Sequence, residues 1–222
     1  MLQNRTILSQ GDNMEESIKM LGNELEKVIM QKIKGKEKIC LTLTGGMDTR
    51  TLLAILIQNN VKFDAFTHNQ PNVKKFRNDV AVAKELASKY AEKHVFVKST
   101  HGSWEEQDIR DALKDYDVVI FGLMMTELLS KYEFYHKSEN SYNEFIKDGI
   151  KVIETYPSHW YSPMLEPSVQ NLIKDIPFKY LIFSKVQREL INRWKCSLLQ
   201  YPHTNYNYKR QFGSYLYHKI IH

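Results

Sequence analysis

The chain has 222 residues, of which 42% are hydrophobic and 26% are charged, and its formal net charge is +5. The length allows one hydrophobic core, or one core with an appended helical lobe, and the composition is ordinary for a globular protein. No apolar stretch reaches the length of a membrane span, which excludes a transmembrane protein.

Two cysteines, Cys40 and Cys196, lie far apart and in no C-x-x-C motif. Such cysteine usage fits a reducing compartment. The start of the chain, MLQNRTILSQGDN, is not typical of a signal peptide. We therefore expect a cytoplasmic location. The lysines are spread along the chain and mixed with glutamates, so we expect most of them on solvated faces.

The first predicted element is an amphipathic helix over residues 13–33, with Asp12 or Asn13 as its cap. The most informative stretch follows it, residues 39–56, ICLTLTGGMDTRTLLAIL. An apolar run at 39–43 ends at a threonine and two glycines, and an apolar helical pattern then begins. This order predicts a strand, a tight glycine loop and a helix over 49–58.

The predicted loop has the features of a phosphate-binding site. Gly45 and Gly46 allow a positive φ or a close ligand approach, and the N–H groups that open the helix favour an anion. Thr44 and Thr49 can add hydroxyl donors, and Asp48 can hold a Mg²⁺. The loop matches neither the Walker A pattern nor G-x-G-x-x-G. The alternative is an ordinary glycine turn between a strand and a helix.

Strands and helices alternate in the next part of the chain. Further strands are predicted at 61–69, 94–98 and 117–122, with helices at 77–94 and 103–113. Ser103 and Glu106 form a predicted capping box at the start of the last of these helices. Such alternation predicts a parallel sheet flanked by helices, with ligands at the carboxyl ends of the strands.

The pattern changes after Gly122. Aromatic helical residues fill 124–156, a loop rich in proline and aromatic residues follows at 156–168, and a basic helix is predicted at 178–194. We therefore predict a nucleotide-binding α/β domain with an N-terminal helix at 1–123, and a helical lobe at 124–222 that packs on it and shapes the substrate site.

The loop Thr44-Gly45-Gly46-Met47-Asp48-Thr49 resembles the S-G-G-x-D-S signature of the PP-loop ATP pyrophosphatases, with threonine in place of both serines. Together with FDAFTHN, NDVAVAKELASKY and FGLMMTELLSKY, it resembles the synthetase domain of the asparagine synthase family. The resemblance covers roughly residues 14 to 205 and is good only in the first half.

This resemblance implies an adenine nucleotide alpha hydrolase-like fold, which is Rossmann-like, and an ATP-dependent ligase that forms AMP and pyrophosphate. Such an enzyme adenylates a carboxylate, which ammonia or an amine then attacks, and it uses ATP and Mg²⁺. The implied ATP and pyrophosphate contacts are Leu43, Thr44, Gly45, Gly46, Asp48, Thr49, Arg50, Thr67 and His68. The implied metal ligands are Asp48 and Glu127, and the implied catalytic cations are Lys185 and Arg188.

The sequence departs from the family at two places. Met125 and Thr126 precede Glu127 where family members often carry Gly-Asp, so one metal carboxylate is missing. Leu2 stands where a glutaminase domain would have its nucleophilic cysteine. We therefore expect a small-molecule carboxylate, together with free ammonia, another amine, or ammonia from a separate glutaminase subunit. No membrane partner is expected.

Two other classes remain open from the sequence. A PP-loop enzyme that modifies tRNA would use the basic surface, although nucleic acid is the less favoured partner and no paired catalytic cysteines are present. A non-catalytic nucleotide-binding relative would explain the missing carboxylate beside Glu127.

Overall fold

The computed structural model describes residues 10–69, 75–99, 104–123, 125–129, 154–174 and 184–202, with 144, 147, 148, 150–152 and 176 between them. The side chains of residues 10–14, 75–78, 126 and 127 lie outside the described part. The helices are α1 (Gln10–Ile33), α2 (Met47–Gln58), α3 (Lys75–Tyr90), α4 (Gln107–Leu113), α5 (Met125–Leu129), α7 (Pro167–Lys174) and α8 (Lys185–Lys195). The strands are β1 (Ile39–Thr42), β2 (Asp64–Asn69), β3 (His94–Lys98), β4 (Val118–Ile120) and β5 (Trp160–Tyr161), and 3₁₀ turns occupy η2 (Pro163–Leu165) and η4 (Cys196–Gln200).

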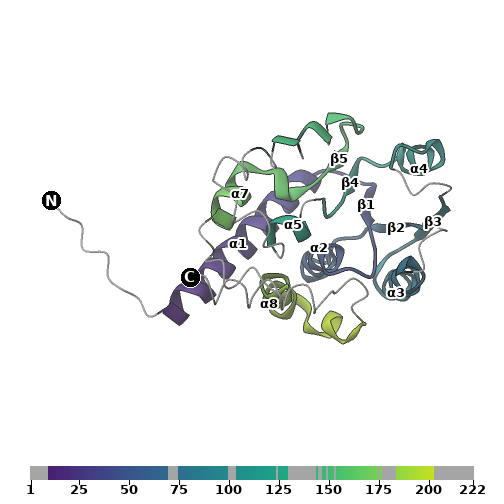
Figure 1. Cartoon of the computed structure of the whole chain (residues 1–222). Coiled ribbons are helices and arrows are strands. Elements are labelled where there is room, and N and C mark those ends of the chain that lie inside the picture. Colours follow the sequence, from purple (N-terminus) through teal and green to yellow (C-terminus); the bar gives the residue numbers. More distant parts are fainter. Residues whose placement is uncertain are drawn as a thin grey trace.

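The five strands form one sheet in the order β3-β2-β1-β4-β5. Every described pairing is parallel, which confirms the predicted parallel sheet flanked by helices. The chain runs outward from β1 to β3 and then returns to β4, on the other side of β1 (Figure 1). The strand order therefore reverses between β1 and β4, and in open α/β sheets ligands bind at the carboxyl side of such a switch point.

The two faces of the sheet are covered by different helices. Leu41 of β1 and Ile120 of β4 belong to the larger core, which includes side chains from α1, α2, α3, α7 and α8. Cys40 and Val119 point to the opposite face and pack with Ile109 of α4. This alternation is the expected result of a side-chain period of two along a strand. In Figure 1, α2 and α3 lie on one side of the sheet and α4 on the other.

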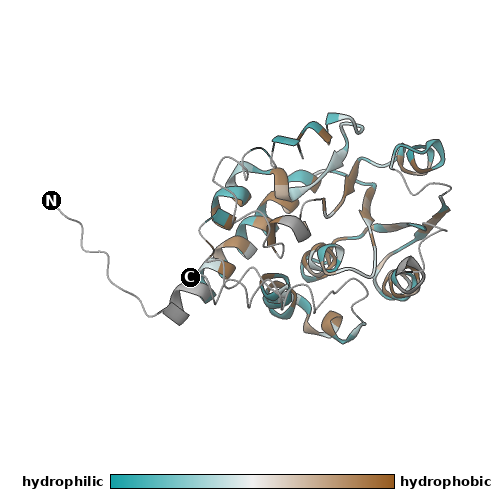
Figure 2. Cartoon of the chain, viewed as in Figure 1, coloured by the Kyte–Doolittle hydropathy of each residue, from teal (hydrophilic) through white to brown (hydrophobic). Residues whose placement is uncertain are grey.

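Helix α2 is buried from Thr49 through Leu56 because it lies against β1 and is covered by α8. This double coverage explains why residues 52–57 of the helix, LLAILI, form an unbroken apolar run. Figure 2 shows the brown hydrophobic colouring of β1 and β4, together with brown parts of α1, α2 and α3. Of the helices that the structure describes, none is both long and apolar enough to cross a membrane.

The structure differs from the sequence-based expectation in two elements. Trp160 and Tyr161 form β5, within a stretch predicted to be a loop, and pair with β4. Glu106 is the N-cap of α4, so the predicted capping box is wrong; its carboxylate accepts a hydrogen bond from Ser99 Oγ at 2.6 Å. Residues on both sides of position 123 share the larger core. The substrate-shaping role of 124–222 stays a prediction.

Candidate active site

The loop between β1 and α2 is closed by its own two hydroxyl side chains. Thr49 Oγ1 accepts a hydrogen bond from the Thr44 N–H at 3.1 Å and lies 3.2 Å from the Thr44 carbonyl oxygen. Thr44 Oγ1 accepts from the Gly46 N–H at 3.1 Å and lies 3.2 Å from Thr49 Oγ1. The hydroxyls at positions 44 and 49 therefore preform the turn.

Gly46 is the N-cap of α2 and has extended backbone angles, with φ −76° and ψ 165°. Gly45 and Gly46 do not have a positive φ, since among the described residues the glycine with positive φ is Gly35. Of the two roles expected for these glycines, close approach of a ligand therefore stays a prediction. A Cβ on Gly46 would meet Thr44 Oγ1 at 3.2 Å. Gly46 supplies no side-chain hydrogen bond to the helix start, and the free N–H groups of a helix N-terminus favour an anion.

The loops that follow β1 and β4 touch at the switch point. Asp48 lies in the first turn of α2, and Gly122 follows β4. A Cβ added to Gly122 would lie 2.9 Å from Asp48 Cβ and 3.6 Å from the Thr49 nitrogen. The start of α2 therefore lies too close for any side chain at position 122, which explains the glycine there.

We expect Gly122→Ala to displace Asp48 and to lower the free energy of unfolding by about 1–3 kcal/mol, the usual cost of overpacking. Gly46→Ala is the matched control, since its backbone accepts a side chain and its nearest neighbour is farther away. Urea denaturation of both variants measures the difference. Equal stability of Gly122→Ala and wild type would show that the two loops do not pack as described.

Arg50 has an exposed fraction of 1%. Its guanidinium donates to the carbonyl oxygens of Gly45 at 2.6 Å and Tyr201 at 2.9 Å. It also donates to the carbonyls of Leu198, at 3.3 Å, and Pro202. Burial lowers the pKa of Arg50 to about 10, so the side chain still carries its charge at neutral pH. Arg50 thus ties the glycine loop to the segment that follows α8.

Leu43, Thr67 and His68 lie where β1 and β2 end. Thr67 Oγ1 donates to the Leu43 carbonyl at 2.8 Å, and His94 Nε2 lies 3.0 Å from the same hydroxyl. Burial and, less strongly, Lys84 lower the pKa of His94, which favours its neutral form. The His68 ring packs edge-on against Trp104 with centroids 4.5 Å apart.

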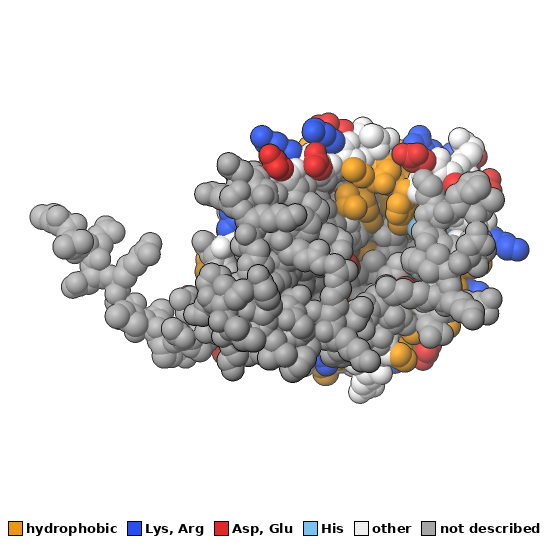
Figure 3. Space-filling view, in the orientation of Figure 1, with side chains coloured by type: hydrophobic (Ala, Val, Ile, Leu, Met, Phe, Trp, Pro, Cys, Tyr) orange, Lys and Arg blue, Asp and Glu red, His pale blue; other side chains and the backbone are white. Residues whose placement is uncertain are grey.

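An aromatic cluster covers the α4 face beside these strand ends. Its rings contact one another at centroid distances from 4.5 to 6.5 Å, and its members are Phe66, His68, Trp104, Phe121, Tyr156 and Trp160. Figure 3 shows hydrophobic side chains gathered on the surface between α4 and β5. The cluster adjoins the switch point through Phe121, the residue before Gly122.

Helix α8 reaches the loop through Gln187. The Gln187 amide donates to Asp48 Oδ1 at 2.5 Å. Lys185 is the first residue of α8 and is partly buried, whereas Arg188 is exposed. The side chain of Glu127, the other predicted metal ligand, lies outside the described residues. Within the described part of the chain, no group of three or more His, Cys, Asp or Glu side chains could hold a metal.

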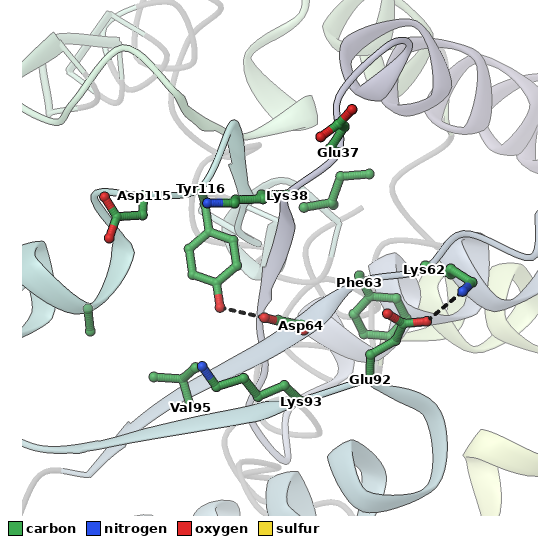
Figure 4. Close-up of a pocket in the computed structure, with 12 residues that line it drawn as sticks. Glu37, Lys38, Lys62, Phe63, Asp64, Glu92, Lys93, Val95, Asp115 and Tyr116 are labelled. Atoms are coloured by element: carbon green, nitrogen blue, oxygen red, sulfur yellow. Dashed lines mark hydrogen bonds and ion pairs between the residues drawn. The ribbon is translucent and has the colours of Figure 1, made fainter.

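A cavity of about 660 Å³ lies at the opposite edge of the sheet, around residues that precede or begin β1, β2 and β3 (Figure 4). Tyr116 donates to Asp64 Oδ2 there at 2.7 Å, and Lys62 pairs with Glu92 at 3.2 Å. Because the strands are parallel, all their amino ends lie at one edge of the sheet and all their carboxyl ends at the other. The cavity lies at the amino ends and the glycine loop at the carboxyl ends, so the length of the strands separates them. It is not part of the candidate site.

No protein-family model matches the sequence, and a search of curated proteins found no match. The solved structures that are similar at low identity include two synthetases and a subunit of a tRNA-modifying enzyme. The NH3-dependent NAD synthetase from Campylobacter jejuni subsp. jejuni NCTC 11168 has a TM-score of 0.37 and 18% identity, over 73% of this chain and 94% of that chain. The NMN synthetase from Francisella tularensis has a TM-score of 0.39 and 13% identity, over 87% and 98% of the two chains.

The third is a predicted subunit of tRNA methyltransferase from Methanocaldococcus jannaschii, with a TM-score of 0.29 and 12% identity, over 74% of this chain and 92% of that chain. These likenesses are too distant to assign a family.

Proposed function

We propose that the chain binds ATP with its phosphates on residues 44–49 and uses it to adenylate a carboxylate, which ammonia or an amine then attacks. The observation that carries this proposal is the contact between Asp48 and Gly122, where the loops after β1 and β4 meet. At this contact, the loop formed by the threonine hydroxyls, the N-terminus of α2 and the Asp48 carboxylate lie together at the switch point of a parallel sheet.

The loop fits a polyphosphate for two reasons. The N-cap of α2 is a glycine that makes no side-chain hydrogen bond to the first turn, and the N–H groups and the positive dipole end at a helix start favour an anion. Gly46 brings no Cβ to that surface. We propose that Leu43, Thr67 and His68, at the ends of β1 and β2, contact the nucleoside part of ATP.

Asp48 fits a Mg²⁺ because this ion is usually held by one or two carboxylates together with phosphate oxygens and water. A bound Mg²⁺ would neutralise phosphate charge during the reaction. Glu127 remains a proposed second ligand. The terminal nitrogens of Arg50 are engaged by backbone carbonyls, so we assign Arg50 to holding the loop rather than to binding pyrophosphate.

In the proposed reaction, a carboxylate oxygen of the substrate bonds to the α-phosphorus of ATP, and the bond to the leaving pyrophosphate breaks. The amine nitrogen then attacks the acyl carbon, loses a proton and displaces AMP. We propose that Lys185 stabilises the charge that grows on the leaving pyrophosphate. In support, Lys185 is partly buried and begins α8, the helix that contacts Asp48 through Gln187. Arg188 is the weaker candidate because it is exposed.

The test is ATP–pyrophosphate exchange with a panel of carboxylates, followed by AMP release after ammonia or amines are added. We expect exchange with at least one carboxylate, and Lys185→Ala should lower its rate by about 10²-fold while ATP affinity falls less. Lys195→Ala, at the other end of α8, is the control. ATP binding without exchange for any carboxylate would instead identify a non-catalytic nucleotide-binding protein.

A further inference from the structure

We propose that Gln187 is a positioning residue of the metal site: its amide nitrogen orients the Asp48 carboxylate, and its amide oxygen accepts a hydrogen bond from water in the hydration shell of the metal. This inference rests on the proposed function, because it assumes that Asp48 holds Mg²⁺. Gln187 belongs to none of the motifs found in the sequence.

The position of Gln187 on α8 is unusual for a polar side chain. Its exposed fraction is 0%, and it lies on the buried side of the helix with Val186, Leu190 and Ile191. An apolar residue would continue this buried stripe without a desolvation cost, and buried polar groups are tolerated when they are hydrogen-bonded. The glutamine therefore needs a polar partner, which the nitrogen finds in Asp48.

The hydrogen bond to Asp48 fixes the carboxylate from the side of α8. The distance of 2.5 Å between Gln187 Nε2 and Asp48 Oδ1 makes it a short hydrogen bond to a carboxylate oxygen. Hydrogen bonds of this kind hold metal-binding carboxylates in orientation and are a regular feature around bound metals. Gly122 contacts Asp48 at its Cβ, so the residue is held both by α8 and by the loop after β4.

The amide oxygen of Gln187 provides the evidence for a ligand at this site. Gln187 Oε1 is buried and has no hydrogen-bond partner among the residues that the structure describes. A buried acceptor without a donor is rare, and each instance calls for an explanation such as an ion or water at the site. Mg²⁺ keeps several water molecules when it binds proteins, and these waters are strong donors. An unpartnered acceptor on a side chain that contacts Asp48 fits such a hydrated cation.

The inference is tested by measuring ATP binding calorimetrically as a function of Mg²⁺ concentration in wild type, Gln187→Leu and Gln187→Met. We expect both variants to need about 10–100-fold more Mg²⁺ for half-maximal effect, the usual loss when such an outer hydrogen bond is removed. Affinity for metal-free ATP should stay near the wild-type value. The EPR spectrum of bound Mn²⁺–ATP should also change, because the metal's surroundings change.

Gln170→Leu is the matched control, since this α7 glutamine donates to the Met164 carbonyl and has no contact with Asp48. It should leave the Mg²⁺ dependence unchanged. If Gln187→Leu does not fold, Gln187→Met gives the same readout with an unbranched side chain of similar length. Loss of stability without a change in Mg²⁺ dependence would make Gln187 only a packing residue and overturn the inference. Absence of ATP binding in wild type would overturn the proposed function and, with it, this role.

Discussion

Asp48→Asn should remove the Mg²⁺ dependence of ATP binding and leave the fold intact. Asparagine has nearly the same shape, and its side-chain oxygen can still accept the hydrogen bond from Gln187. The charge that attracts the metal is lost, so we expect pyrophosphate exchange to fall by about 10²–10³-fold, the range for one lost electrostatic group. Calorimetry with and without Mg²⁺ measures the binding, and circular dichroism confirms the fold.

Asp64→Asn is the control for this change. Asp64 is also partly buried and hydrogen-bonded, but it begins β2 at the edge of the sheet opposite to the loop. It should leave ATP binding unchanged. If Asp48→Asn binds ATP with the affinity and metal dependence of wild type, Asp48 is not a metal ligand and the loop needs another explanation.

Arg50→Met should give the largest loss of stability among the changes considered. The variant keeps most of the aliphatic stem but removes a buried guanidinium that donates to four carbonyl oxygens, of Gly45, Leu198, Tyr201 and Pro202. Buried acceptors that lose their donor cost about 1–3 kcal/mol each, so we expect the free energy of unfolding to fall by about 3 kcal/mol or more. Urea denaturation measures this loss.

Arg193→Met is the matched control, because Arg193 also makes two hydrogen bonds, to the Lys19 carbonyl and Asn23, but is exposed. Exposed contacts of this kind contribute about 1 kcal/mol or less. Similar losses for the two arginines would mean that Arg50 does not hold the loop to the chain that follows α8. Limited proteolysis should also cut near residues 198–202 faster in Arg50→Met, since that segment loses its attachment.

The part of the fold that local patterns determine could be predicted from the sequence. The strand at 94–98 is found as β3 with the same bounds, and the strand, glycine loop and helix around Gly45 are found as β1 and α2. In these stretches the hydrophobic period, the glycines and the polar residues at the boundaries all indicate the same elements. Strand β5 could not be predicted, because a two-residue strand in a proline-rich stretch has no period and depends on β4 beside it.

The candidate site was only partly predictable for the same reason. Thr44, Asp48 and Thr49 are close in sequence, so a six-residue pattern could identify them together. Arg50 looked like a pyrophosphate ligand, but three of its partners come 148 to 152 residues later, where no local pattern points to them. Gln187 gave one signal that was missed: it is a polar residue at a position of the α8 stripe that is otherwise apolar.

Amide hydrogen exchange with and without Mg²⁺–ATP shows directly which ends of the strands bind the nucleotide. We expect slower exchange in residues 44–50 and at Gly122, where the loops after β1 and β4 meet. Residues 62–64 and 92–95, around the cavity at the amino ends of the strands, should exchange at unchanged rates. Protection around that cavity with no change in residues 44–50 would mean that the glycine loop does not bind the nucleotide.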